Sequence, residues 1–323
     1  MKISVIIPVY NRKEFVLQAV DSVLKNKISS DIQIIVVTNL SDSEINEKLI
    51  KRGVEIISSR DETLGGKIAE ATLKCDGDII SILEDDDRFN MNKIRIIEKE
   101  FEDRRLGFFH NSVSVIDLNG KEKVSPRTKH RILNVPNERK EEFLKDIHEM
   151  KGYYNTSSMT LRREIMMDIV PYMKKIKLNA DLLLFLGALR SDLDLKFSTM
   201  RLTEYRKHNS FSNPMYHSFR DFLQNNFEFM DILLKDSLVY QEMMKDEPLY
   251  QYTLAWMQFI KKSAFLFSHH TFPIEELQID KKYNWVPFGK RKNRMIDAAV
   301  NQSPFIRKFV LRLLYMSKYS ISP

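Results

Sequence analysis

Cysteine and glycine are scarce in this sequence, which has one cysteine, Cys75, and nine glycines in 323 residues. A single cysteine cannot form an internal disulfide, so a disulfide-stapled scaffold is excluded and a reducing compartment is expected. No Gly-x-Gly-x-x-Gly motif follows the first predicted strand, and no P-loop is present. Dinucleotide binding and the usual mode of ATP binding are therefore disfavoured.

Long apolar segments are also absent, because no uninterrupted apolar run is long enough to cross a membrane as a helix. Met1 and Lys2 lead straight into a predicted strand, so no signal peptide is expected. The remaining composition, 43% hydrophobic and 29% charged, is typical of a globular protein. We therefore expect a cytoplasmic protein with one large domain or two ordinary ones.

Positive charge is concentrated near the C-terminus. Residues 281–323 contain ten Lys or Arg and one acidic residue, a local net charge of +9. The whole chain carries +7, so residues 1–280 carry −2. Such asymmetry indicates an acidic partner surface, for which nucleic acid and anionic lipid are the two candidates.

The most informative stretch is an apolar run, 79–83, that ends in four carboxylates, Glu84, Asp85, Asp86 and Asp87. The run has the length and isoleucine content of a buried strand. Open α/β sheets bind their ligands at the carboxyl ends of such strands. A cation would relieve the repulsion between the acids, and oxygen ligands suit Mg²⁺ or Mn²⁺. The alternative is a solvated acidic turn that caps the next helix.

Strands and helices alternate four times before the acidic stretch ends. This alternation predicts a doubly wound, mostly parallel α/β sheet with helices on both faces. The loops after the strands, including 10–12, 38–39 and 84–87, should emerge at one edge of the sheet, where a nucleotide would lie. The predicted strands are 2–9, 32–37, 54–57 and 79–83, and the helices between them are 11–24, 42–51 and 65–74.

The rest of the chain is less regular. Residues 209–214 are rich in turn formers, and we place the domain boundary there, between 1–212 and a helical region, 213–323. Before the boundary we expect helices 92–103, 138–150 and one from 162, an apolar helix 182–189, strands 108–117, 196–200 and 203–206, a hairpin turn 118–121 and a loop 121–137. After it we expect helices 216–236, 248–268, 292–301 and 305–318.

Four segments occur in the order found in family-2 glycosyltransferases of the GT-A fold, and the chain resembles that family over about residues 1–212. They are Ile3-Ser4-Val5-Ile6-Ile7-Pro8-Val9-Tyr10-Asn11-Arg12, Glu84-Asp85-Asp86-Asp87 with Arg88-Phe89 and Lys93-Ile94, Ala180-Asp181, and Tyr205-Arg206-Lys207-His208 with Ser210 and Ser212. The resemblance implies a GT-A (Rossmann-like) domain that binds a nucleotide diphosphate sugar, followed by a C-terminal α-helical extension.

The resemblance also implies an inverting enzyme that moves a sugar from a nucleotide diphosphate sugar, with UDP-sugars favoured, to a hydroxyl acceptor. Such a reaction needs a divalent metal, Mn²⁺ or Mg²⁺, to neutralise the leaving diphosphate and a general base to take the hydroxyl proton. The matching residues are Asp181 as catalytic base and Asp86 and His208 at the metal. The implied donor-binding residues are Pro8, Tyr10, Asn11, Arg12, Asn39, Lys67, Glu84 and Asp85.

Two positions depart from the family pattern. The family usually has an acidic residue before the base, where this chain has Ala180. It also usually has an aspartate after the second strand to accept from the nucleobase, where this chain has Asn39. The asparagine oxygen can still accept one bond, but it carries no charge, so uridine as the base is less secure than the fold.

Several candidates have a simpler structural interpretation. Asp181 suits an N-cap of helix 182–189, and Asp87 suits a cap of the helix after the acids. Lys67 could be a solvated lysine instead of a diphosphate ligand at a helix N-terminus. His208 could be structural, and the polar residues 155–158 could be ordinary caps where an acceptor would otherwise approach.

The last predicted helix places Ile306, Phe309, Val310, Leu313 and Leu314 on one face, with basic residues towards the other. A basic amphipathic helix indicates peripheral binding to an anionic membrane surface, here on the cytoplasmic face. The alternative is a helix packed on the catalytic domain with a solvated basic side. The family's acceptors, often lipid-linked or cell-surface glycans, favour the membrane, and no nucleic-acid motif is present.

Two other functions compete with sugar transfer. A sugar nucleotidyltransferase shares the fold class but usually opens with a glycine-rich signature, which is missing here. A non-catalytic nucleotide-sugar-binding module would be a degenerate relative that has lost turnover. Asn39 and Ala180 are the only hints of such degeneration.

Overall fold

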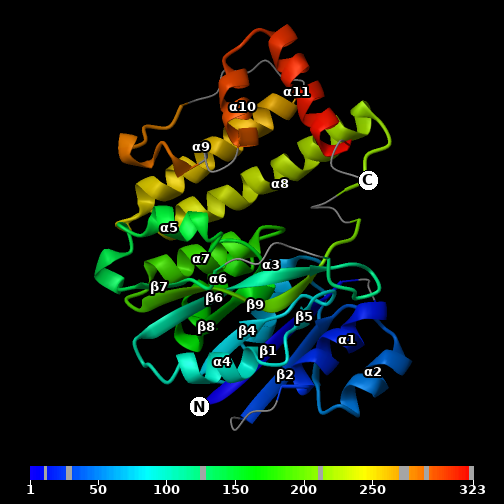
Figure 1. The fold of residues 1–323 in the computed structure, drawn as a ribbon. Helices are drawn as coiled ribbons and strands as arrows, with labels where there is room; N and C mark the ends of the chain where they lie inside the picture. Colours follow the sequence, from blue (N-terminus) through cyan, green and yellow to red (C-terminus); the bar gives the residue numbers. More distant parts are fainter. Residues whose placement is uncertain are drawn as a thin grey trace. The chain divides into compact units, whose positions relative to one another are not determined.

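The computed structural model describes residues 1–10, 13–26, 31–123, 129–209, 214–268, 276–286 and 291–319. The chain divides into two compact units, Met1–His208 and Asn209–Pro323. Figure 1 shows the fold of each unit. The predicted boundary between residues 212 and 213 lies outside the described residues and stays a prediction.

The first unit is built on one mixed sheet, whose strands in the described residues number nine. One half is parallel, in the order β3-β2-β1-β4. This half confirms the predicted parallel α/β sheet, because continuous apolar runs stay buried where helices cover both faces. Its strands are β1 (Lys2–Val9), β2 (Asp31–Thr38), β3 (Glu55–Ser58) and β4 (Ile79–Ile82), with α1 (Lys13–Leu24), α2 (Ser43–Ile50) and α3 (Leu64–Thr72) between them.

Local signals explain where these helices begin. The side chain of Asp42 accepts from the amide of Ile45 and caps α2, and Thr63 accepts from Gly66 and caps α3. Each bond satisfies one of the amides that a helix N-terminus leaves without a partner. Gly53, at φ +74°, ends the α2 segment in the left-handed conformation that favours glycine.

The other half of the sheet runs β4-β8-β6-β9-β5 and contains antiparallel pairs. Its strands are β5 (Arg88–Phe89), β6 (Leu106–Ile116), β7 (Ile132–Val135), β8 (Met159–Arg162) and β9 (Asp194–Arg206), and β7 pairs with β9. Its helices are α4 (Lys93–Glu100), η1 (Asn137–Arg139), α5 (Leu144–Glu149), η2 (Thr156–Ser158), α6 (Arg163–Met173) and α7 (Ala180–Arg190). Strand β6 is parallel to β9, so the carboxyl ends of β4, β6 and β9 meet at one edge.

Four predictions for this half were wrong. Residues 159–162 form the central strand β8, although only a helix was expected from 162. The predicted loop 121–137 contains β7, and the two short strands expected over 196–206 are one long strand, β9, with shifts of register against β6. The helix expected over 138–150 is shorter, because residues 140–143 separate η1 from α5.

The second unit is helical in its described residues. It contains α8 (Phe219–Met244), α9 (Tyr250–Phe267), η3 (Lys281–Tyr283), α10 (Arg291–Val300) and α11 (Pro304–Tyr319). Helices α8 to α11 share an apolar core that includes Phe222, Phe267, Ile296, Leu311 and Leu314. Among the described helices, none has the length and hydropathy of a transmembrane span.

Candidate active site

The four acids after β4 form a tight turn that is bonded to two other segments. The backbone amide of Tyr10, after β1, donates to Asp85 Oδ2 at 2.7 Å. The amide of Glu84 donates to Ser157 Oγ at 3.0 Å, and the hydroxyl of Thr156 donates to the Glu84 carboxylate. The predicted acidic turn is therefore fixed between the end of β1 and the short helix η2.

Asp86 and His208 lie in direct contact, although they are far apart in the sequence. His208 Nε2 is 2.6 Å from Asp86 Oδ2, and both side chains are largely buried. Arg206, at the end of β9, donates from Nε to the backbone oxygen of Asp86 at 2.7 Å. The end of β9 thus brings the two predicted metal ligands together.

Asp87 is turned inward and does not cap the helix after the acids. The residue before α4 is Asn92, and Asp87 Oδ1 instead accepts from the amide of Arg206 at 2.9 Å. Its Oδ2 has no partner at hydrogen-bonding geometry in the described residues. Burial, with Asp86 and Glu84 adding to it, raises the pKa of Asp87 well above its usual value. Ser157, close by, opposes this rise.

The guanidinium of Arg206 is the buried cation beneath this turn. Besides Asp86, it donates to the backbone oxygens of Asp117 and Leu118 and to Gln18 Oε1, at 2.8–3.1 Å. It also lies 4.4 Å from the centre of the Phe15 ring. Burial lowers the pKa of Arg206, while Asp86 and Asp87 oppose that effect. Arg206 belongs to the family-like segment Tyr205-Arg206-Lys207-His208, but the sequence did not predict that its side chain would support the acidic turn.

Lys67 is fully buried, so its interpretation as a solvated surface lysine was wrong. Its Nζ donates to the backbone oxygen of Val9 at 2.7 Å and to Asn39 Oδ1 at 3.3 Å, and lies 4.3 Å from the centre of the Tyr10 ring. Burial lowers its pKa, and the nearby charge of Asp85 opposes the change. Lys67 therefore joins Tyr10, Asn39 and Asp85, three other predicted donor residues.

Asp181 lies in the first turn of α7, whose N-cap position is Asn179. The N-cap interpretation of Asp181 was therefore wrong. Its Oδ2 accepts from the amide of Asn155 at 3.0 Å and its Oδ1 from the amide of Leu182 at 2.9 Å. Burial raises the pKa of Asp181 to about 6, and these amide bonds oppose the rise. The carboxylate is therefore a stronger base than an ordinary aspartate.

Asn155 connects Asp181 to the acidic turn. Its backbone is in the left-handed region, at φ +73°, where a non-glycine residue is strained. Its amide holds Asp181, and the next two residues, Thr156 and Ser157, hold Glu84. The predicted polar patch 155–158 thus links the candidate base to the candidate metal site, a role that caps alone would not require.

A buried lysine that the sequence reading did not assign supports the same segment. Lys93 is fully buried, and its Nζ donates to the Ser157 carbonyl and, at 3.0 Å, to Thr203 Oγ1. Its amine also lies 4.1 Å from the centre of the Phe89 ring. Burial lowers its pKa well below the usual lysine value, and Asp87 opposes the effect. The signal that could have predicted this role is the position of Lys93 in the family-like segment that follows the four acids.

A tyrosine beside the candidate base was also missed. Tyr154 precedes Asn155 and is 45% exposed. The centre of its ring lies 6.4 Å from the centre of the Tyr205 ring. Partial burial raises the pKa of Tyr154, and the charges of Asp181 and Glu84 raise it further. The ring is therefore close to both carboxylates.

Three of the predicted donor residues lie within β1 or shortly after it in the sequence. Pro8 lies inside β1, paired in register with Val37. Asn11 and Arg12 lie outside the described residues. No group of three His, Cys, Asp or Glu side chains suited to a metal occurs in the described part of the chain. Of the predicted metal ligands, Asp86 and His208 are in contact with each other.

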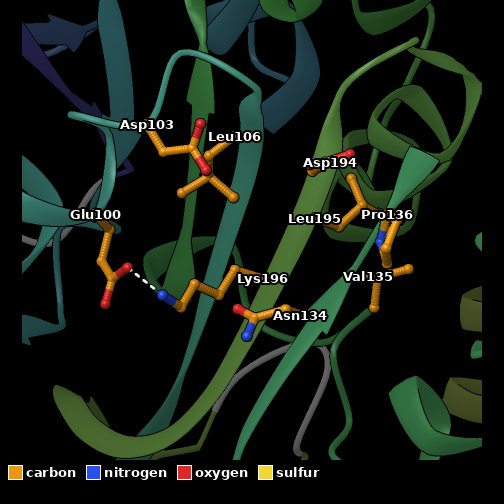
Figure 2. A pocket seen from close by; sticks show the side chains of 9 residues that line it. All are labelled: Glu100, Asp103, Leu106, Asn134, Val135, Pro136, Asp194, Leu195 and Lys196. Carbon is orange, nitrogen blue, oxygen red and sulfur yellow. Dashed lines mark hydrogen bonds and ion pairs between the residues drawn. The ribbon is translucent and has the colours of Figure 1, made fainter.

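A small cavity of about 140 Å³ lies elsewhere in the first unit (Figure 2). It is lined at the starts of β6 and β9 and includes the ion pair of Lys196 with Glu100. Lys196 and Arg206 are separated by ten residues of β9, which correspond to about 30 Å of extended strand. The cavity is therefore at the opposite end of the strand from the acidic turn.

Comparison with known proteins identifies the class. Residues 4–169, about half of the chain, match the family model described as Glycosyl transferase family 2. The chain therefore belongs to the family-2 glycosyltransferases, as its sequence motifs predicted. Uncharacterized glycosyltransferases of Rickettsia bellii and Rickettsia felis are 34% and 32% identical over 125 and 124 residues, or 37% of this chain. The matched segments span only 18% and 20% of those relatives.

Solved structures support the fold. Residues 1–349 of TarS from S. aureus, in complex with UDP-GlcNAc, align with a TM-score of 0.51 over 83% of this chain and 86% of that one, at 14% identity. The longer TarS structure aligns with a TM-score of 0.51 over 93% of this chain and 48% of its own length. These likenesses confirm the predicted GT-A architecture.

Proposed function

We propose that this protein transfers a sugar from a nucleotide diphosphate sugar, with a UDP-sugar favoured, to a hydroxyl acceptor with inversion. The observation that carries the proposal is the bridge of residues 155–157 between two carboxylate centres. The amide of Asn155 holds the candidate base Asp181, and Thr156 and Ser157 hold the acidic turn at Glu84. A base and a diphosphate site fixed to one short segment are what in-line transfer requires.

The metal of this reaction would be held by Asp86 and His208. A carboxylate and an imidazole suit Mn²⁺, and Mg²⁺ is commonly bound by one or two carboxylates with the substrate phosphates supplying further oxygens. The two protein ligands already touch at 2.6 Å, so one ion could replace their mutual hydrogen bond. When bound, such an ion acts as a Lewis acid towards the leaving diphosphate.

Asp181 is the proposed general base. Its pKa of about 6 leaves it mostly ionised at neutral pH yet more basic than an ordinary aspartate. The proton of the acceptor hydroxyl would pass to a carboxylate oxygen as the hydroxyl attacks the sugar. The two backbone amides that bind Asp181 fix its orientation and stabilise its charged form.

The donor is proposed to bind beside Lys67 and Asn39. Lysine can only donate, so its contact fixes Asn39 Oδ1 towards Lys67 and leaves the Asn39 amide nitrogen able to donate to a nucleobase carbonyl. Uridine offers such carbonyls, and the TarS structure with UDP-GlcNAc supports the choice of a UDP-sugar. Tyr10 and Lys67, together with Asn11, Arg12 and Pro8, complete the proposed donor side.

The acceptor is proposed to be a lipid-linked or cell-surface glycan, reached by a cytoplasmic protein at the membrane. Tyr154 supports an acceptor site near the base, because an exposed ring can stack on the apolar face of a sugar. Glycan biosynthesis is the corresponding process. A non-catalytic nucleotide-sugar-binding module and a sugar nucleotidyltransferase are the competing functions.

The proposal is tested by incubating the protein with a panel of UDP- and GDP-sugars and Mn²⁺ or Mg²⁺, and measuring release of the nucleotide. The variant Asp181→Asn should lose turnover by about 10²–10⁴-fold while it still binds the donor. Glu47→Gln, a change on the exposed side of α2, is the matched control and should retain turnover. Donor binding without turnover in the unmodified protein, with every acceptor class offered, would favour the non-catalytic module.

A further inference from the structure

Helix α11 has two apolar faces, and one of them is exposed. Val310, Leu311 and Leu314 pack into the core of the second unit. Phe305, Phe309 and Met316 are instead 82%, 56% and 62% exposed. The single apolar face predicted from the sequence was therefore wrong in part, because Val310 and Leu314 point inward while Phe309 points outward.

The exposed apolar residues form one continuous stripe. Phe305, Phe309, Leu313 and Met316 follow one another at spacings of four, four and three residues, which places them along one side of a helix. Ile306, also exposed, widens the stripe at its start. Sixteen helical residues are about 24 Å long, so the stripe runs along a rod of that length. Monomeric soluble proteins rarely expose such a contiguous apolar surface unless it binds a partner, a ligand or a membrane.

Basic residues border the stripe on one side. Lys308 and Arg312 are exposed, and each is three residues from one of the two phenylalanines, so their side chains lie beside the apolar row. Helix α11 contains no acidic residue. Both arginines of α11 also lie near aromatic rings of the second unit. Arg307 donates to the Gln302 carbonyl and lies 4.7 Å from the centre of the Phe265 ring, and Arg312 lies 5.9 Å from the centre of the Phe219 ring.

We propose that this exposed face of α11 docks onto an anionic lipid surface, with Phe305, Phe309, Leu313 and Met316 inserted among the lipids. Lys308 and Arg312 would contact the acidic headgroups. An apolar stripe with a basic border is the pattern of helices that lie in the plane of a membrane interface. The local net charge of +9 over residues 281–323 adds long-range attraction to an anionic leaflet.

The exposed face of α11 would be the surface by which the protein associates with the membrane, and the need for such binding rests on the proposed function. Docking would hold the protein at the bilayer where a lipid-linked acceptor lies. The docking itself requires neither donor nor metal, so it is measured independently of turnover. Asp181→Asn, which removes the proposed base, should bind vesicles as well as the unmodified protein does.

The test is co-sedimentation with vesicles of phosphatidylcholine alone and of equal parts phosphatidylcholine and phosphatidylglycerol. The full chain should bind the anionic vesicles and bind the neutral ones far more weakly. The double change of Phe305 and Phe309 to serine should weaken anionic binding by about tenfold or more, since two phenylalanine side chains leave the apolar phase. Changing Lys308 and Arg312 to glutamine should weaken it too and reduce its sensitivity to salt.

The matched control is Leu238→Ser on α8, because Leu238 is 56% exposed, the same fraction as Phe309. That variant should bind as the unmodified protein does. Equal binding to neutral and anionic vesicles, no binding to either, or full binding by the double serine variant would each overturn the proposal. Light scattering without vesicles completes the test: a dimer that the double serine change converts to monomer would show a self-association surface instead.

Discussion

Replacing the proposed base, Asp181, should change how stability depends on pH. Relative to the unmodified protein, the variant should gain stability as the pH rises, even though it loses activity. Burial raises the pKa of Asp181 from 3.8 to about 6. The folded protein therefore binds this proton more tightly than the unfolded chain does. The stabilising effect of that proton is complete below the unfolded pKa and is lost as the pH rises through about 6. At roughly 1.4 kcal/mol per pH unit, the loss by neutral pH is about 3 kcal/mol.

Asparagine does not ionise, so the variant Asp181→Asn does not lose stability as the pH rises through the pKa of Asp181. The asparagine cannot accept from both amides that now bind Asp181, which costs about 1 kcal/mol at every pH. That cost is a constant offset. The difference in unfolding free energy, variant minus unmodified protein, should therefore increase by up to about 3 kcal/mol between about pH 4 and about pH 8.

The assay is urea denaturation of both proteins across that pH range, with the free energy of unfolding extrapolated to zero urea. Glu47→Gln, on the exposed side of α2, is the control for the loss of one carboxylate charge. A difference between Asp181→Asn and the unmodified protein that stays constant with pH would refute the raised pKa. A difference that falls with increasing pH would show that the hydrogen bonds to Asp181 outweigh its burial.

Two further changes test the buried cations beneath the site. Lys93→Met keeps the length of the side chain and removes a buried amine, so it should cost only about 1–2 kcal/mol of stability, from the lost bonds to the Ser157 carbonyl and Thr203 Oγ1. Lys93→Ala should cost clearly more, because it leaves a cavity, and equal losses in urea denaturation would contradict this account. Arg206→Gln removes the buried guanidinium that binds Asp86, Asp117 and Leu118, and should cost about 3–5 kcal/mol. A melting temperature unchanged by Arg206→Gln would show that the turn is held without it.

The parts of the fold that could be predicted are those whose residues carry their own signal. Continuous apolar runs predicted β1, β2 and β4, and the cap expected at Asp42 matches the start of α2. Strand β8 is four residues long and is stabilised by ladders to β4 and β6, which no local pattern encodes. The same is true of β7 on β9.

The candidate site shows the same division. The acidic turn and Asp181 are recognisable from residue type and order, but their partners come from distant segments. The contact of Asp86 with His208 joins residues 122 positions apart, and the bond from Asn155 to Asp181 depends on a left-handed backbone at Asn155. Lys67 was the hardest case, because a lysine after two glycines gives no sign that it will be fully buried.

The central claim is that Asp86 and His208 form a metal-dependent donor site, and its most direct test is thermal stability. The protein is heated with each nucleotide and nucleotide sugar, with and without Mn²⁺ or Mg²⁺. A ligand that binds only the folded state raises the free energy of unfolding by about 2.7 kcal/mol at a hundredfold excess over its Kd, and the melting temperature rises as a result. We expect a rise with uridine nucleotides that requires the metal and disappears in Asp86→Ala but not in Glu47→Ala. A rise that is independent of metal, or that persists in Asp86→Ala, would contradict the claim.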